Sequence, residues 1–223
     1  MLGISEQDSV DRFIISWNAM PHDGKEFRRL ISATHELLRP FFDDSAGEIY
    51  TAHQMHQYLH MLRWMSYPMT PLPIELAEGK TDVTLLDYGC GMALTSIATA
   101  IDWGRQGITV HLTLADLDTV MTEFLHYACA KLDISHRMVQ LPCTFTPACQ
   151  IAIVTEVWEH LYDFVGALEA IDNALAPGGL LVTDITDRHK EMFHVSPDLS
   201  ALRERFAQMN YAQVEQKVWR KNA

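Results

Sequence analysis

The sequence has no hydrophobic run of the about 18 residues that a membrane-spanning helix requires. Its first residues, Met1 to Asp8, are acidic and carry no signal-peptide core. Cysteine is scarce, and no two of the four cysteines show the short spacing of a metal or redox pair: Cys90, Cys129, Cys143 and Cys149. These absences predict a protein of the reducing cytoplasm with no membrane partner.

Basic residues are also few. Seventeen Lys and Arg stand against 29 Asp and Glu, which gives a formal net charge of −12. The nearest basic clusters, at 25–29 and at 220–221, are short. Binding to a phosphate backbone needs clustered positive charge, so no nucleic-acid partner is expected, and the charge favours a small-molecule or protein substrate. The oligomeric state leaves no trace in the sequence.

The chain is long enough for one α/β domain with an appendage, since 48% of its 223 residues are apolar. Helical periodicity runs through the first 66 residues, as in the spacing of Val10, Phe13, Ile14 and Trp17. The proline-rich segment 68–73 then breaks any helix. We therefore predict an N-terminal helical cap or lid with its linker over 1–80 and a core domain over 81–223.

Strand and helix patterns alternate after residue 80. We expect strands at 83–88, 108–115, 136–141, 150–155 and 180–185, helices at 92–103, 118–132, 162–175 and 197–209, and one last strand, Gln213–Arg220. Such alternation predicts an α/β fold with a mostly parallel sheet flanked by helices.

The stretch 83–93 carries the most specific motif, a buried strand that runs into a tight glycine turn. Gly89 and Gly91 occupy the first and third positions of a dinucleotide-binding turn, but its sixth position is Leu94. Asp87 lies two residues before the first glycine, where a carboxylate would repel a pyrophosphate. A dehydrogenase is therefore disfavoured, and a cationic cofactor without phosphate, such as S-adenosylmethionine (SAM), is favoured.

The next predicted strand ends in a second acidic residue, Asp116. At the tip of the second strand of an open α/β sheet, a carboxylate can reach the ribose hydroxyls of an adenosine. The neighbouring Asp118 is expected only to cap the following helix. The predicted cofactor-binding residues are Asp87, Gly89, Gly91, Asp116 and Leu117.

The D-x-G-x-G pattern at 87–91 resembles motif I of the class I SAM-dependent methyltransferases, and the element order resembles that family throughout 81–223. The run 175–181 is similar to the family's turn before the fifth strand. The resemblance implies a Rossmann-like fold and SAM as cofactor. Two features depart from it. The segment 140–144 lacks the acid that often contacts adenine after the third strand, so backbone groups are expected there, and one final strand is evident instead of a hairpin.

A second motif, E-x-x-E-H, follows the fourth predicted strand. If this segment is helical, Glu156, Glu159 and His160 share one face. The run resembles the metal site of ubiquinone-biosynthesis O-methyltransferases, which implies Mg²⁺ or Mn²⁺, with Zn²⁺ or Fe²⁺ less suited. Three interpretations stay open: a metal site, a catalytic or substrate-contacting role of His160 and Glu159 without metal, and a structural role.

Histidines form a third group. His53, His56 and His60 lie within one face of a predicted N-terminal helix, away from its apolar stripe. They fit a solvated face, a general base or a metal site, and the sequence does not decide between these. His189 and His194 could add a ligand or a base, or be polar loop residues.

Together these features predict a SAM-dependent methyltransferase that acts on a small molecule, with O-methylation slightly favoured. The rival is a protein of the same fold that binds the cofactor without methylating, as a regulatory subunit or with a cyclase or decarboxylase activity. The methyl acceptor cannot be read from the sequence, because acceptor pockets are built from variable loops.

Overall fold

The computed structural model describes residues 70–117, 125–126, 129–130, 132–146, 148–187, 195 and 198–222. Several predictions lie outside these residues: the N-terminal helices with their three histidines, the cap at Asp118, and the loop histidines His189 and His194. The domain boundary near residue 80 also stays a prediction.

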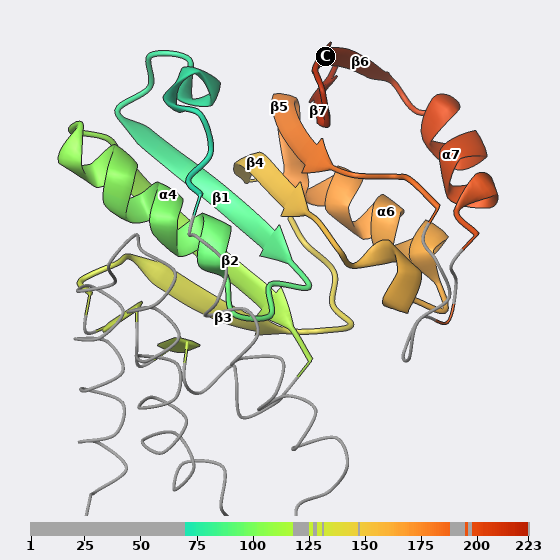
Figure 1. Ribbon diagram of the computed structural model, residues 1–223, viewed down its shortest axis with the longest axis horizontal. Helices are drawn as coiled ribbons and strands as arrows, with labels where there is room; N and C mark the ends of the chain where they lie inside the picture. The colour runs from blue at the N-terminus through green and yellow to red at the C-terminus, as the bar shows by residue number, and fades with distance from the viewer. Residues whose placement is uncertain are drawn as a thin grey trace, which may run out of the picture.

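The described chain is organised around a seven-stranded sheet in the order β3-β2-β1-β4-β5-β7-β6 (Figure 1). Its strands are β1 (Asp82–Tyr88), β2 (Thr109–Asp116), β3 (His136–Gln140), β4 (Cys149–Val154), β5 (Leu175–Thr183), β6 (Tyr211–Glu215) and β7 (Val218–Lys221). The first five pair in parallel, and β7 is antiparallel to both of its neighbours. The predicted mostly parallel α/β fold is confirmed.

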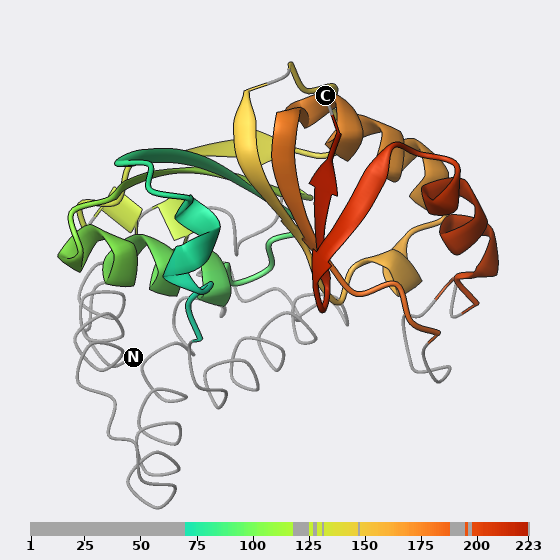
Figure 2. The same ribbon diagram turned by 90° about the horizontal axis from the view of Figure 1, so that it is seen from above.

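Helices cover both faces of the sheet, as the view from above shows (Figure 2). Helix α4 (Leu94–Arg105) packs on one face, where Val83, Leu85 and Leu112 are buried. Helix α6 (Phe164–Ala174) packs on the other, over Leu86 and Val154. The central strands β1, β4 and β5 thus bury side chains on both faces, which explains their largely apolar sequences.

Helix α6 begins where the sequence changes from polar to apolar. Asp163 is its N-cap, and the carboxylate accepts a 2.8 Å hydrogen bond from the backbone N–H of Gly166. Such a cap pairs one of the free N–H groups of the first turn. Helix α7 (Ser200–Ala207) packs beside α6 and leads into the last two strands.

The C-terminal end differs from the expected single strand Gln213–Arg220. It is a hairpin in which β6 and β7 are joined at Lys217, whose φ of +64° is left-handed. The prediction was wrong because neither turn residue, Gln216 nor Lys217, is a glycine, asparagine or proline, the residue types that indicate a turn in a sequence. With two strands in place, the sheet closes as the family resemblance implied.

The connection from β3 to β4 is short. Its described residues, 141–146 and 148, contain no helix and run directly back across the sheet. Leu141 and Phe145 pack into the apolar cluster on the α6 face. A loop therefore occupies the place of a crossover helix next to the carboxyl ends of β1 and β2.

The segment just before β1 belongs to the core. The short 3-10 helix η1 (Ile74–Ala77) buries Leu76 and Ala77 in the cluster on the α4 face. Two hydrogen bonds hold the backbone of Leu72 to α4. Its N–H donates to the Thr99 hydroxyl (2.9 Å), and its carbonyl accepts from the Trp103 indole N–H (3.0 Å). No helix in the described ranges is long and apolar enough to cross a membrane.

Candidate cofactor and active site

The glycine turn lies at the carboxyl end of β1, as predicted. Gly89 and Gly91 both adopt left-handed backbone conformations, with φ of +67° and +49°. The N–H groups of Gly89 and Cys90 donate to the carbonyl of Ala115 at the end of β2, over 2.8 and 3.1 Å. The turn is therefore fixed to the tip of the neighbouring strand.

Gly89 also has no room for a side chain. A Cβ atom at this position would lie 2.7 Å from the side chain of Val157, closer than real Cβ atoms approach. Around Gly91, in contrast, no atom of the described residues outside its immediate neighbours lies within 4 Å of such a Cβ. The first glycine therefore lets the segment after β4 pack on the turn, and the second leaves open space beside the backbone.

Ala93 occupies a place that the sequence analysis did not single out. It precedes α4 with a φ of +49°, a conformation that favours glycine, and it is buried. The D-x-G-x-G motif therefore continues into a third left-handed residue. The relevant signal was the alternate spacing of 89, 91 and 93, whereas the dinucleotide template directed attention to Leu94.

Asp116 lies at the tip of β2 and contacts the turn directly. Its carboxylate accepts hydrogen bonds from the backbone N–H groups of Gly91 (2.6 Å) and Leu117 (2.7 Å). Burial raises the pKa of Asp116, and these two N–H donors oppose that rise. The structure thus brings together the glycine turn and the acid at the tip of β2, with Gly91 and Asp116 25 residues apart in sequence.

Asp87 is the more deeply placed carboxylate, with 7% of the residue exposed. Its Oδ2 accepts a 2.5 Å hydrogen bond from the hydroxyl of Ser96 in α4. Burial raises the pKa of Asp87 to about 7, the Ser96 hydrogen bond opposes this rise, and the nearby Asp116 adds to it. Ser96 was missed by the sequence analysis, since a serine inside an apolar helix carries no signal of its own.

Within the described residues, Oδ1 of Asp87 accepts no hydrogen bond. A buried, unpaired carboxylate oxygen is costly unless a ligand pairs it. A positively charged group of a ligand could therefore pair with this oxygen. Leu117, 56% exposed, offers an apolar surface beside that position.

The E-x-x-E-H segment does not form the expected helical face. Only the 3-10 turn η2 (Trp158–His160) is helical, and Glu156 precedes it with a left-handed φ of +56°. Glu159 is buried at 2% exposure, whereas Glu156 and His160 are exposed. The three side chains therefore do not share one face.

The metal interpretation of this run is not supported by that geometry. No group of three or more His, Cys, Asp or Glu side chains in the described part of the chain could hold a metal ion. Glu156, Glu159 and His160 all belong to that part.

A buried hydrogen-bond chain anchors this segment to the sheet. The Trp158 indole donates to the hydroxyl of Thr183 (2.7 Å), which itself donates to the carbonyl of Val154 (2.8 Å). Val154 and Thr183 lie side by side in β4 and β5. The anchor fixes where the chain leaves β4 and thereby presents His160 at the carboxyl edge of the sheet.

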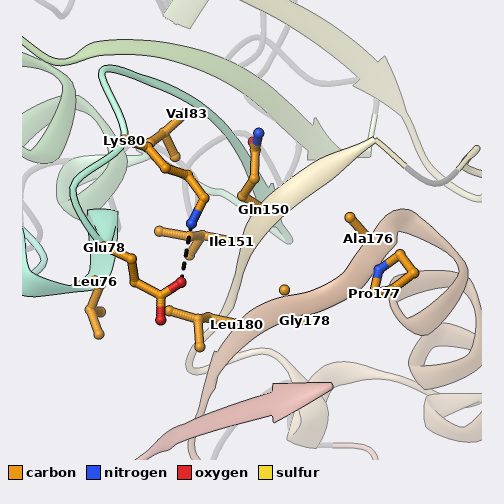
Figure 3. A pocket seen from close by; sticks show the side chains of 11 residues that line it. Leu76, Glu78, Lys80, Val83, Gln150, Ile151, Ala176, Pro177, Gly178 and Leu180 are labelled. Atoms are coloured by element: carbon orange, nitrogen blue, oxygen red, sulfur yellow. Dashed lines mark hydrogen bonds and ion pairs between the residues drawn. The ribbon is translucent and has the colours of Figure 1, made fainter. Parts of the chain in front are cut away.

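A separate cavity of about 80 Å³ lies at the opposite edge of the sheet (Figure 3). The ion pair of Glu78 and Lys80, with 3.1 Å between Oε2 and Nζ, lies beside it. Its walls come from η1 and from the amino ends of β1 and β4, together with 176–180 of β5. It is too small for a nucleoside and lies at the wrong ends of the strands for the cofactor.

Comparisons with known proteins identify the family and the fold of the chain. The sequence profile of a methyltransferase domain family matches residues 23–222. No curated protein matches the chain. A structure from Listeria monocytogenes, described as a candidate class I SAM-dependent methyltransferase, aligns with a TM-score of 0.53 and 14% identity over 99% of this chain and 76% of that one.

Shorter alignments were found with two other structures. A SAM-dependent methyltransferase from Mesorhizobium loti matches with a TM-score of 0.36 and 18% identity over 46% of each chain. The 4+2 cyclase SpnF matches with a TM-score of 0.46 and 20% identity, over 62% of this chain and 57% of its own. The family profile spans most of the sequence, and the Listeria structure shows the same fold. The chain therefore belongs to the methyltransferase domain family, within the class I SAM-dependent methyltransferases.

Proposed function

We propose that this protein transfers the methyl group of SAM to a small-molecule acceptor, and that the acceptor atom is a hydroxyl oxygen. The observation that carries the proposal is the buried Asp87, whose open oxygen faces no partner among the described residues. A family fold alone would not require such a group. A cofactor with a cationic methionine end supplies the missing partner.

Each residue of the turn has a role in this proposal. Asp87 holds the amino group of the cofactor. Asp116 holds the ribose, and the hydrogen bond it accepts from the Gly91 N–H fixes the turn. Gly91 allows the cofactor to approach the backbone, since no atom fills the space beside it. When bound, SAM supplies an electrophilic methyl group on a sulfonium. The protein's task is to align the acceptor in line with that bond.

His160 is the candidate base. It is exposed at the carboxyl edge of β4, on a segment anchored by Trp158 and Thr183. A neutral imidazole can take the proton that a hydroxyl acceptor loses as its oxygen is methylated. Glu159, nearly fully buried, is placed to orient this segment and not to touch the acceptor.

The test begins with calorimetric binding of S-adenosylhomocysteine to the wild type and to Asp87→Ala. A panel of phenols, aliphatic alcohols and amines is then incubated with methyl-labelled SAM, with and without a chelator. We expect micromolar binding that Asp87→Ala weakens, and chelator-insensitive labelling of a hydroxyl compound. The control Tyr162→Ala changes an exposed side chain of the same region.

Different failures carry different meanings. Binding without label transfer to any acceptor would favour the non-methylating rival. Labelling of amines alone would leave the methyltransferase intact and refute the hydroxyl acceptor. Absence of cofactor binding to the wild type would refute the proposal as a whole.

A further inference from the structure

The small cavity at the amino ends of the strands is shaped by a bulge in β5. Between two successive register pairs, β4 has the single residue Gln150, whereas β5 has the four residues 176–179, which form one wall of the cavity. Gly178 has a left-handed φ of +77°, and a Cβ at Gly179 would lie 2.9 Å from the carbonyl oxygen of Ala176. The local sequence therefore determines the shape of this wall.

Arg220 of β7 joins two walls of the cavity. Its guanidinium forms an ion pair with Glu78 and donates a 3.2 Å hydrogen bond to the carbonyl of Gly178 in the bulge. Lys80 pairs with the other oxygen of Glu78, over 3.1 Å. Two cations thus share one carboxylate, which leaves an excess of positive charge beside the cavity, in a chain whose net charge is −12.

Two side chains that line the cavity also have unused N–H donors. Lys80 uses one of its three donors in the ion pair with Glu78. Gln150 is held by its Oε1, which accepts a 2.5 Å hydrogen bond from the backbone N–H of Thr84 in β1, and its amide nitrogen donates to no described residue. Positive charge together with free N–H groups favours the binding of an anion.

The rest of the lining is mostly apolar, and its residues are Leu76, Val83, Ile151, Ala176, Pro177 and Leu180. Figure 3 shows the charged ends of Lys80 and Glu78 turned toward each other, with Pro177 on the opposite side. Because about 10–15 Å³ holds one water molecule, the volume of about 80 Å³ has room for about six non-hydrogen atoms. The ligand that fits is therefore small and partly apolar.

We propose that this cavity binds a short-chain carboxylate of the size of butyrate. The carboxylate group is held by Lys80 and Gln150, and the hydrocarbon chain lies against the apolar walls. A phosphate or sulfate ion would leave those walls without a partner. The inference does not depend on the proposed cofactor, because the glycine turn lies at the other end of β1.

The test titrates the full-length protein with butyrate and follows the backbone amide signals by NMR. We expect one saturable site with a Kd of roughly 1 mM, and shifts at Gly178 and Gly179 but not at Gly91. Butyramide, the uncharged analogue, should bind at least about 10-fold more weakly because it lacks the charge. Inorganic phosphate should also bind more weakly, because it has no chain to bury.

Two substitutions locate the site. Gln150→Glu keeps an oxygen for the Thr84 N–H but replaces the amide donor with a carboxylate that repels the ligand. Lys80→Met keeps the aliphatic part of the side chain and removes its charge. Each should weaken butyrate binding about 10-fold or more. Gln208→Glu makes the same change of charge at the exposed C-terminal end of α7 and is the matched control, with unchanged affinity.

Several results would overturn the inference. The wild type might show no saturable shift at the bulge, or butyramide might bind as tightly as butyrate, which would remove the role of charge. Phosphate binding more tightly than butyrate would contradict the carboxylate class. An equal loss of affinity in Gln208→Glu and Gln150→Glu would show that the overall charge of the protein acts on the ligand and not this cavity.

Discussion

The hydroxyl of Ser96 lies 2.5 Å from Oδ2 of Asp87, in a place where neither residue is open to solvent. This contact joins the first turn of α4 to the tip of β1. It orients the carboxylate whose other oxygen we assign to the cofactor. Because a hydroxyl donor favours the ionised carboxylate, it also opposes the effect of burial on that group.

The buried carboxylate should make stability depend on pH. With its pKa raised to about 7, Asp87 keeps a proton in the folded protein between about pH 4 and 7, whereas the unfolded chain loses it. The free energy of unfolding should therefore fall as pH rises through this range. We expect Asp87→Asn to be more stable than the wild type at pH 8, by up to a few kcal/mol, with little difference near pH 4.

Urea unfolding at a series of pH values measures this difference. Ser96→Ala is the informative companion, because losing its hydroxyl raises the pKa of folded Asp87 further and extends the fall in stability to higher pH. An identical pH dependence in the wild type and in Asp87→Asn would contradict the assignment.

Cofactor binding should release a proton from the same carboxyl. A cationic ligand favours the ionised form of Asp87, so the affinity for SAM should decrease as pH falls below about 7. Calorimetry at pH 6.5 in two buffers of different ionisation enthalpy measures the proton count directly. We expect release of a fraction of one proton for the wild type and almost none for Asp87→Asn.

Replacement of Gly89 by alanine should destabilise the protein by about 2–4 kcal/mol, since it adds a clash with Val157 to the cost of a left-handed φ. In a Val157→Ala background the clash is removed, and a penalty of about 1 kcal/mol from the backbone should remain. Gly91→Ala, with open space around it, is the control and should show the backbone penalty alone. Equal penalties for Gly89→Ala in both backgrounds would refute the close approach.

The buried hydroxyl of Thr183 is expected to matter for stability and activity together. Thr183→Val preserves the shape of the side chain but leaves the Trp158 indole N–H unpaired, which should cost about 2–3 kcal/mol in urea unfolding. Trp158→Phe in the same background removes that unpaired donor, so the two losses should be less than additive. Strict additivity would show that the hydrogen bond contributes nothing.

The sequence was informative wherever a side chain's role depended on its own neighbours in the chain. The strand before Gly89, the acid at Asp116 and the alternation of elements all followed from local patterns, and the structure bears out the sheet. The E-x-x-E-H run misled because the same letters suit a helix and a short 3-10 turn. What separates them is the left-handed backbone at Glu156, a conformation that no sequence rule assigns to glutamate.

Contacts between distant segments were out of reach of the sequence. Ser96 meets Asp87, and Trp158 meets Thr183, only because the sheet brings their elements together. Both contacts lie at the candidate site, where the packing of the elements determines which functional groups meet.

The placement of β7 has a consequence for how the chain is synthesised and folds. β7 lies between β5 and β6, so β6 leaves the ribosome before the strand that joins it to the sheet. Arg220 of β7 also pairs with Glu78, 142 residues earlier in the chain. The edge of β5 therefore stays uncovered until nearly all of this sequence has been translated. A nascent chain halted before residue 218 would expose the unpaired backbone N–H and C=O groups of this edge to other chains.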